Sequence, residues 1–168
     1  MSNTVPGDSG PSSLLFRPMA LDREGEVYRS ARRDAWLAVY PDLLAFDGPG
    51  FLEEAREQQL WDPRALRCVV LDGQIIGILQ LATLSGARAG VGHVPFLWVR
   101  ENFRRQGLGS LLLKQAEDTY RSMGRKVLRL QCSPANRPAR QFYRAHGFVK
   151  IGQVPGAQEA LDLLEKEI

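Results

Sequence analysis

The sequence predicts one mixed α/β domain, in which helices flank a central mixed sheet. An apolar strand at residues 93–99 runs through a glycine turn into an amphipathic helix and then into a second apolar strand, which is the pattern of a parallel βαβ unit. An Asp-Gly pair at residues 72–73 joins two apolar runs and is typical of an antiparallel hairpin. At 168 residues, 44% of them hydrophobic, the chain suits a single domain with a sizeable core.

The remaining elements follow from apolar periodicity and from residues that start or stop helices. Asp22 is a candidate N-cap of the first helix, and Asn136 is a candidate N-cap of the last one. The expected strands cover residues 14–18, 67–71, 74–83, 93–99, 127–132 and 148–153, and the expected helices cover residues 22–40, 51–60, 107–123 and 136–145. Residues 1–13 are rich in Gly, Pro, Ser and Asn, which predicts a flexible tail before a domain at 14–168.

Composition and charge argue against several classes of protein. A net charge of +3 is too small to indicate a nucleic acid partner, because the arginines gather near one turn instead of forming a run. No apolar stretch reaches the roughly 18 residues that a membrane span needs, and the first residues lack the pattern of a signal peptide. We therefore expect a cytoplasmic protein with no membrane partner. Cys68 and Cys132 lie in apolar segments without a metal-binding spacing, which predicts two reduced core thiols and no metal site.

The turn at residues 104–110, Arg-Arg-Gln-Gly-Leu-Gly-Ser, has the chemistry of an anion site. Its glycines permit a tight turn and close approach of a ligand, and the first amides of the following helix have no acceptors within that helix. The helix dipole and the charges of Arg104 and Arg105 add positive potential at the same place. We expect a phosphorylated cofactor here. The alternative is an ordinary strand-to-helix turn with packing glycines and solvated arginines.

Two well-known glycine loops fit this turn poorly. A dinucleotide fingerprint needs a third glycine or alanine where Leu112 stands, and an acidic residue about 20 residues further on. A Walker loop needs Gly-Lys-Ser/Thr, which the chain lacks. An unrelated nucleotide-binding protein is therefore the weakest of the alternatives.

Two motifs closely resemble the GNAT superfamily of acyl-CoA-dependent N-acyltransferases. Arg104, Gly107 and Gly109 form the Arg-x-x-Gly-x-Gly pattern with which that family binds acyl-CoA. Residues 136–148 resemble the family's Asn-x-x-Ala-x-x-Phe-Tyr-x-x-x-Gly-Phe element and follow in the right order and spacing. The resemblance implies a GNAT-like fold with a parallel βαβ cofactor unit. It also places a final antiparallel strand at residues 158–168, where spacing alone favours a helix.

The resemblance further implies acetyl-CoA as the acyl donor and assigns residues to it. Leu97 and Val99 would offer backbone groups to the pantetheine arm and the acetyl carbonyl. Asn136 would contact the same arm, serve as a helix cap, or do both. Next to Arg104, the pyrophosphate would lie on the backbone amides of Arg105, Gln106, Gly107, Leu108, Gly109 and Ser110.

Candidates for proton transfer are Tyr143 and His93. Tyr143 matches the family tyrosine proposed to protonate the departing thiolate, and its alternative role is an aromatic core residue beside Phe142. Several superfamily members use a glutamate as base early in the strand before the turn, and this chain has His93 there, fourteen residues before Gly107. An imidazole could take the proton directly or through water, or be a plain strand-edge histidine. His146, in the last turn of its helix, is expected to cap that helix.

The sequence thus predicts an N-acetyltransferase that moves an acetyl group from acetyl-CoA to a primary amine by direct attack in a ternary complex. The acceptor is left open among small-molecule amines, antibiotics, amino acids and protein N-termini or lysines, and a homodimer is left open too. In the family the acceptor wall comes from the helix-loop-helix region, here around residues 42–50. A non-catalytic acyl-CoA sensor or partner-binding module is the alternative, because the glutamate is missing.

Overall fold

The computed structural model describes residues 13–86 and 89–168, and the structural statements below concern these residues. The predicted tail therefore lies, except for Ser13, outside the described residues. The helices are α1 (Leu21–Leu37), α2 (Gly48–Trp61), α3 (Leu108–Ser122) and α4 (Arg137–Ala145). The strands are β1 (Leu15–Pro18), β2 (Leu66–Leu71), β3 (Gln74–Gln80), β4 (Val91–His93), β5 (Phe96–Val99), β6 (Val127–Cys132), β7 (Val149–Pro155) and β8 (Ala160–Glu167).

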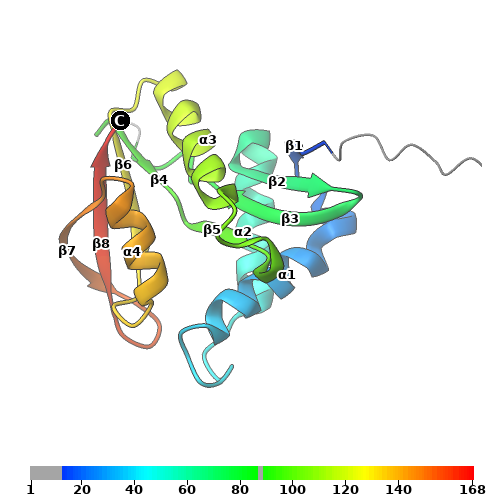
Figure 1. Ribbon diagram of the computed structural model, residues 1–168, viewed down its shortest axis with the longest axis horizontal. Coiled ribbons are helices and arrows are strands. Elements are labelled where there is room, and N and C mark those ends of the chain that lie inside the picture. Colours follow the sequence, from blue (N-terminus) through cyan, green and yellow to red (C-terminus); the bar gives the residue numbers. More distant parts are fainter. Residues whose placement is uncertain (1–12, 87–88) are drawn as a thin grey trace, which may run out of the picture.

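The strands form two four-stranded sheets that lie side by side, with α3 between them (Figure 1). The first sheet has the order β1-β2-β3-β5 and is antiparallel throughout. The second has the order β4-β6-β8-β7, and β4 runs parallel to β6 while the other pairs are antiparallel. The mixed α/β class is confirmed, and so is the strand expected at the C-terminus.

The single strand expected at residues 93–99 is wrong, because the chain divides it between the two sheets. Val94 still donates its N–H to the Arg129 carbonyl at 3.0 Å, in the second sheet. Pro95 has no N–H to donate, and pairing resumes only at Phe96, now with Gln80 of the first sheet. The parallel βαβ unit therefore consists of β4, α3 and β6.

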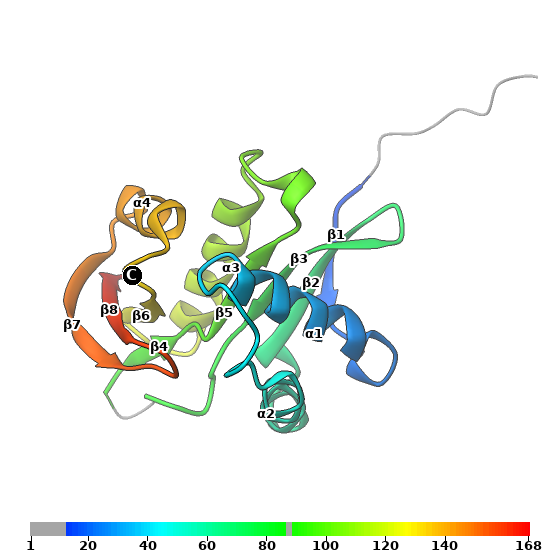
Figure 2. The same cartoon turned by 90° about the horizontal axis from the view of Figure 1, so that it is seen from below.

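Helices cover both faces of the first sheet, as Figure 2 shows. Side chains alternate across a strand, so neighbours in β2 enter different cores. Cys68 and Val70 pack with α1 and α2, whereas Val69 packs with α3. Both cysteines are buried and unpaired with each other, as predicted, and burial raises the pKa of each thiol to about 11.

The first helix begins differently from the prediction. The N-cap position is Ala20 and makes no side-chain cap, while Asp22 lies within the first turn. Glu24 instead accepts the Ala20 N–H at 2.7 Å, because its longer side chain reaches back over the turn while Arg17 holds its carboxylate. The helix ends at Leu37, three residues before the expected end, and leaves Tyr40 in the following loop.

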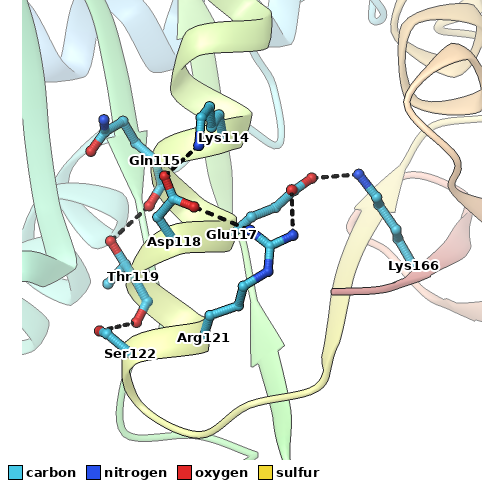
Figure 3. Close-up of polar contacts among 8 residues, drawn as sticks. All are labelled: Lys114, Gln115, Glu117, Asp118, Thr119, Arg121, Ser122 and Lys166. Atoms are coloured by element: carbon cyan, nitrogen blue, oxygen red, sulfur yellow. Dashed lines mark hydrogen bonds and ion pairs between the residues drawn. The ribbon is translucent and has the colours of Figure 1, made fainter.

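The C-terminal half of α3 is fixed to the second sheet by charged side chains (Figure 3). The nearly buried Glu117 accepts from Lys166 of β8 at 2.5 Å and from Arg121 of its own helix at 3.1 Å. The other face of α3 is packed on the first sheet through Leu108 and Leu112. The helix is therefore held by both sheets, and its N-terminus has a defined place relative to each. None of the helices in the described part of the chain is long and apolar enough to cross a membrane.

Candidate active site

The strands β5 and β6 diverge, and this leaves hydrogen-bonding groups of β5 without a partner strand. The Arg100 N–H binds the Ile76 carbonyl at 2.9 Å, which sets the alternation of the antiparallel pair. By that alternation Phe96 and Trp98 bond to β3, while the backbone groups of Leu97 and Val99 point the other way, toward the divide. Leu97 and Val99, which the sequence predicted to offer backbone groups to a cofactor, are thus the residues of β5 whose backbone groups face the divide.

A cavity of about 450 Å³ occupies the divide. Its walls come from β5 and β6, from α4, and from α1 and α2 on the opposite side. Asn136 at the N-cap of α4, Tyr143 within α4 and Leu97 of β5 all line it, so three residues predicted for the site lie on one cavity.

The turn before α3 has an unusual backbone that leaves amides free. Arg105 has φ +62° and Gly107 has φ +84°, and a left-handed conformation at a non-glycine residue such as Arg105 is uncommon. Gly107 is the N-cap of α3 and provides no side-chain cap. The amides of Leu108, Gly109 and Ser110 therefore have no acceptor in the helix, and the alternating turn conformation forms a concave nest of N–H groups. This is the geometry expected of an anion site.

Arg104 does not point its charge at these amides. Its Nε donates to the Val99 carbonyl at 2.8 Å, and its Nη2 donates to Asp34 of α1 at 3.0 Å. Asp34 also accepts the Trp98 indole N–H at 2.8 Å. Arg104 thus ties the turn to β5 and α1, and the positive potential at the turn comes from the backbone and from the exposed Arg105.

The helix α4 presents its two adjacent aromatic residues to different surroundings. The Phe142 ring lies over α3, where a Cβ on Gly109 would come within 3.2 Å of it. Tyr143 lines the cavity and packs edge-on against Phe148 with 5.6 Å between ring centroids. Burial raises the pKa of the Tyr143 phenol, which keeps it protonated, and no described residue accepts a hydrogen bond from its hydroxyl.

Both polar ends of α4 are capped as predicted. Asn136 Oδ1 accepts the Ala139 N–H at 3.2 Å, and its contact with a pantetheine arm stays a prediction. His146 Nδ1 lies 2.8 Å from the Phe142 carbonyl and must donate to it, since a carbonyl only accepts. In the neutral ring Nε2 then accepts from the Ser110 hydroxyl at 2.9 Å. This link between α4 and the start of α3 was not predicted.

His93 lies at the end of β4, one residue before the cavity wall begins at Val94. Its imidazole packs against the loop before β4, where a Cβ on Gly86 would lie 3.1 Å from Nε2. Burial, together with the charges of Arg129 and Arg125, lowers its pKa below 6.5. The ring is therefore neutral at pH 7 and able to accept a proton, but it does not line the cavity.

Comparison with known proteins gives the family. Residues 30–148 match the acetyltransferase (GNAT) family. The chain belongs to this family. GCN5-related N-acetyltransferase 4, chloroplastic, from Arabidopsis thaliana is 32% identical over 95 residues, which cover 51% of this chain and 33% of the plant protein. The matched part therefore spans about a third of the length of that curated relative.

Solved structures agree with the GNAT fold. Ard1 from Thermoplasma volcanium superposes with a TM-score of 0.68 at 19% identity, covering 92% of this chain and 97% of Ard1. The PaiA N-acetyltransferase from Thermoplasma acidophilum, solved in complex with coenzyme A, gives 0.66 at 16% identity, covering 93% and 99% of the two chains. At these identities the likeness concerns the fold alone.

Two charged groups at the GNAT cavity were missed from the sequence. Arg32 of α1 lines the cavity but stands beside Arg33 in a charged helical segment, where it is indistinguishable from a solvated residue. Glu159, before β8, accepts hydrogen bonds from the Ser133 hydroxyl and from Tyr40 Oη, the latter at 3.4 Å. Because Ser133 and Tyr40 line the cavity, this carboxylate lies next to its wall. No local motif marks either residue.

Proposed function

We propose that the protein is an N-acetyltransferase that moves an acetyl group from acetyl-CoA to a primary amine by direct attack in a ternary complex. The observation that carries the proposal is the uncapped start of α3 at the carboxyl end of β5, beside a divide toward which Leu97 directs its N–H and carbonyl and Val99 its N–H, the Val99 carbonyl being bound by Arg104. The free amides at the start of α3 suit a pyrophosphate, and the unpaired edge of β5 suits an amide-bearing arm that hydrogen-bonds to a strand edge.

The two ends of the cavity wall suit two substrates. Tyr143, Asn136 and Leu97 lie on the side of β5 and α4, where the thioester would be held. Residues of α1 and α2 form the opposite wall, where an acceptor would enter. The PaiA relative was solved with coenzyme A, which supports the same class of cofactor here.

In the proposed reaction the neutral amine nitrogen attacks the carbonyl carbon of the thioester. A carbon–nitrogen bond forms, the carbon–sulfur bond breaks, and the sulfur leaves as a thiolate. Tyr143 gives its phenolic proton to that thiolate, and its raised pKa ensures that the proton is present at neutral pH. We propose that the Leu97 N–H, on the cavity wall, binds the carbonyl oxygen as negative charge develops on it, and that the Val99 N–H binds the pantetheine arm further along the strand.

His93 is proposed as the base that removes the surplus proton from the amine. Its lowered pKa leaves the imidazole neutral at pH 7. Since its ring packs beside the Gly86 loop and outside the cavity wall, the proton would travel through water.

Calorimetry with acetyl-CoA, free CoA and ATP tests the cofactor, and a library of amine acceptors with thiol detection tests the reaction. We expect binding of the first two ligands in preference to ATP, and thiol release with at least one class of amine. Binding without any thiol release would identify an acyl-CoA sensor. Equal binding of ATP would refute the cofactor assignment.

A further inference from the structure

Arg32 is a cation at the cavity wall without an anion of its own. Its guanidinium packs against aromatic rings, with 4.0 Å from Cζ to the Phe96 centroid and 4.5 Å to the Phe51 centroid. Nε donates to Tyr28 Oη at 2.9 Å, and Nη2 donates to Gln80 Oε1 at 2.7 Å. Within the described part of the chain, Nη1 has no hydrogen-bond partner and no carboxylate pairs with the group.

The groups that hold Arg32 are themselves fixed. Tyr28 and Gln80 are fully buried, and the Tyr28 hydroxyl donates to Gln80 Oε1 at 2.7 Å. The Gln80 amide in turn donates to Gln58 of α2 at 2.9 Å. This chain of buried hydrogen bonds, which joins α1, β3 and α2, gives the guanidinium one position. Ordering a long side chain in this way costs entropy, which a solvated surface arginine would not lose.

A half-buried cation is destabilised by lost hydration unless an anion compensates it. The groups that Arg32 contacts directly are neutral, namely a phenol, an amide and aromatic rings, and Glu54, whose charge is felt at Tyr28, forms no ion pair with it in the described part of the chain. The charge of Arg32 is therefore only partly compensated inside the protein, and Arg32 lines the cavity on the side formed by α1, α2 and β5.

We infer that Arg32 binds an oxyanion of the acceptor, so that the acceptor is an amine that also carries a carboxylate or an equivalent acid, as a free amino acid does. The inference rests on the proposed function, since it names the substrate class of that site. Protein N-termini and lysine side chains are disfavoured by it, because their neighbouring carbonyls are neutral amides. The aromatic walls, including Trp36 and Tyr40, favour an acceptor with an apolar or aromatic side chain.

The test compares matched acceptors with the parent protein and two variants. Each amino acid of a panel is paired with its amide, with the amine that lacks its carboxylate, and with its aminophosphonate. For the parent we expect kcat/KM for the acid to exceed that for the amide by roughly 10- to 100-fold, the range for a hydrogen bond to a charged group. Arg32→Gln removes that preference, while Arg32→Lys keeps part of it. Arg33→Gln, which changes the adjacent exposed arginine, leaves it unchanged.

The ratio of kcat/KM for the acid to kcat/KM for the amide is taken within each variant, so a partial loss of folded protein affects both values equally and cancels. Amides acetylated as well as acids, or an acid preference that survives in Arg32→Gln, would overturn the inference while leaving the acetyltransferase proposal intact. A second measurement, calorimetry with N-acetyl amino acids and their amides, needs no turnover. Acid-selective binding that is lost in Arg32→Gln would support the Arg32 site even if the acetyltransferase proposal failed. Equal binding of acid and amide would count against the site.

Discussion

Replacement of Gly107 by valine separates anion binding by the turn from the stability of the fold. Gly107 has φ +84°, and a Cβ built on it would meet no atom within 4 Å. The added Cβ therefore meets no clash, and the expected cost is the strain of a left-handed L-residue, about 1–2 kcal/mol. A domain with a free energy of unfolding of about 5–15 kcal/mol stays folded, and for this length Tm falls by roughly 2–8 °C.

Gly124 provides a matched control at the other end of the same helix. It has φ +74°, and a Cβ there would also meet nothing within 4 Å. Gly124→Val should cause a similar loss of stability, because the backbone strain is the same. Only Gly107→Val, however, alters the amides at the start of α3 and places methyl groups beside them.

The assay is calorimetry of acetyl-CoA binding to both variants and to the parent. If the phosphates use two or more amides of the turn, at about 1.5 kcal/mol or more for each hydrogen bond to a charged group, Gly107→Val weakens binding at least roughly 100-fold. Gly124→Val should bind as the parent does. Equal affinities of the two variants would refute the assignment of this turn to the pyrophosphate.

Three further predictions concern the other residues of the candidate site. Tyr143→Phe should keep acetyl-CoA affinity and slow turnover by roughly 100-fold. Because the raised pKa keeps the Tyr143 phenol protonated, the rate of the parent protein should not fall up to about pH 10. Equal rates of parent and variant would return Tyr143 to a packing role. His93 has a lowered pKa, so the rate should rise with pH through an inflection below 6.5, and the stability contributed by the neutral ring should be lost as pH falls below that value. His93→Gln, compared with the parent on the same amine, should remove the low-pH inflection and slow turnover, whereas an unchanged profile would leave the proton to solvent. Asn136→Ala should lower the free energy of unfolding, measured by chemical denaturation, by about 1 kcal/mol because the cap is lost, whereas Asn136→Ser should retain the cap. Weaker acetyl-CoA binding by the serine variant would show that Asn136 contacts the cofactor. Unchanged binding would leave the residue only its capping role.

Much of the backbone geometry of the proposed cofactor site was predictable, because it depends on local chemistry. The positive φ of Gly107 and Gly147, the cap made by Asn136, and the hairpin at Asp72 and Gly73 follow from sterics and hydrogen bonds within a few residues. The local prediction was wrong at Asp22, because the longer side chain of Glu24, two residues further on, accepts the Ala20 N–H instead.

The sequence by itself therefore determined the class of fold, the family and the place of the turn that we propose binds the pyrophosphate. Pro95 marks in the sequence where strand 93–99 can break, but only the tertiary structure decided that the residues on either side of it pair with two different sheets. It also decided that Arg104 pairs with Asp34, 70 residues away, and that Arg32 is fixed by Gln80, 48 residues away. Periodicity identifies the buried face of a segment, but the partner of a charged side chain depends on which distant segment the fold brings beside it. For that reason the sequence placed the proposed acceptor wall around residues 42–50, whereas that side of the cavity is lined by residues of α1, by Val39 and Tyr40 and by Phe51, and by no residue of 42–50.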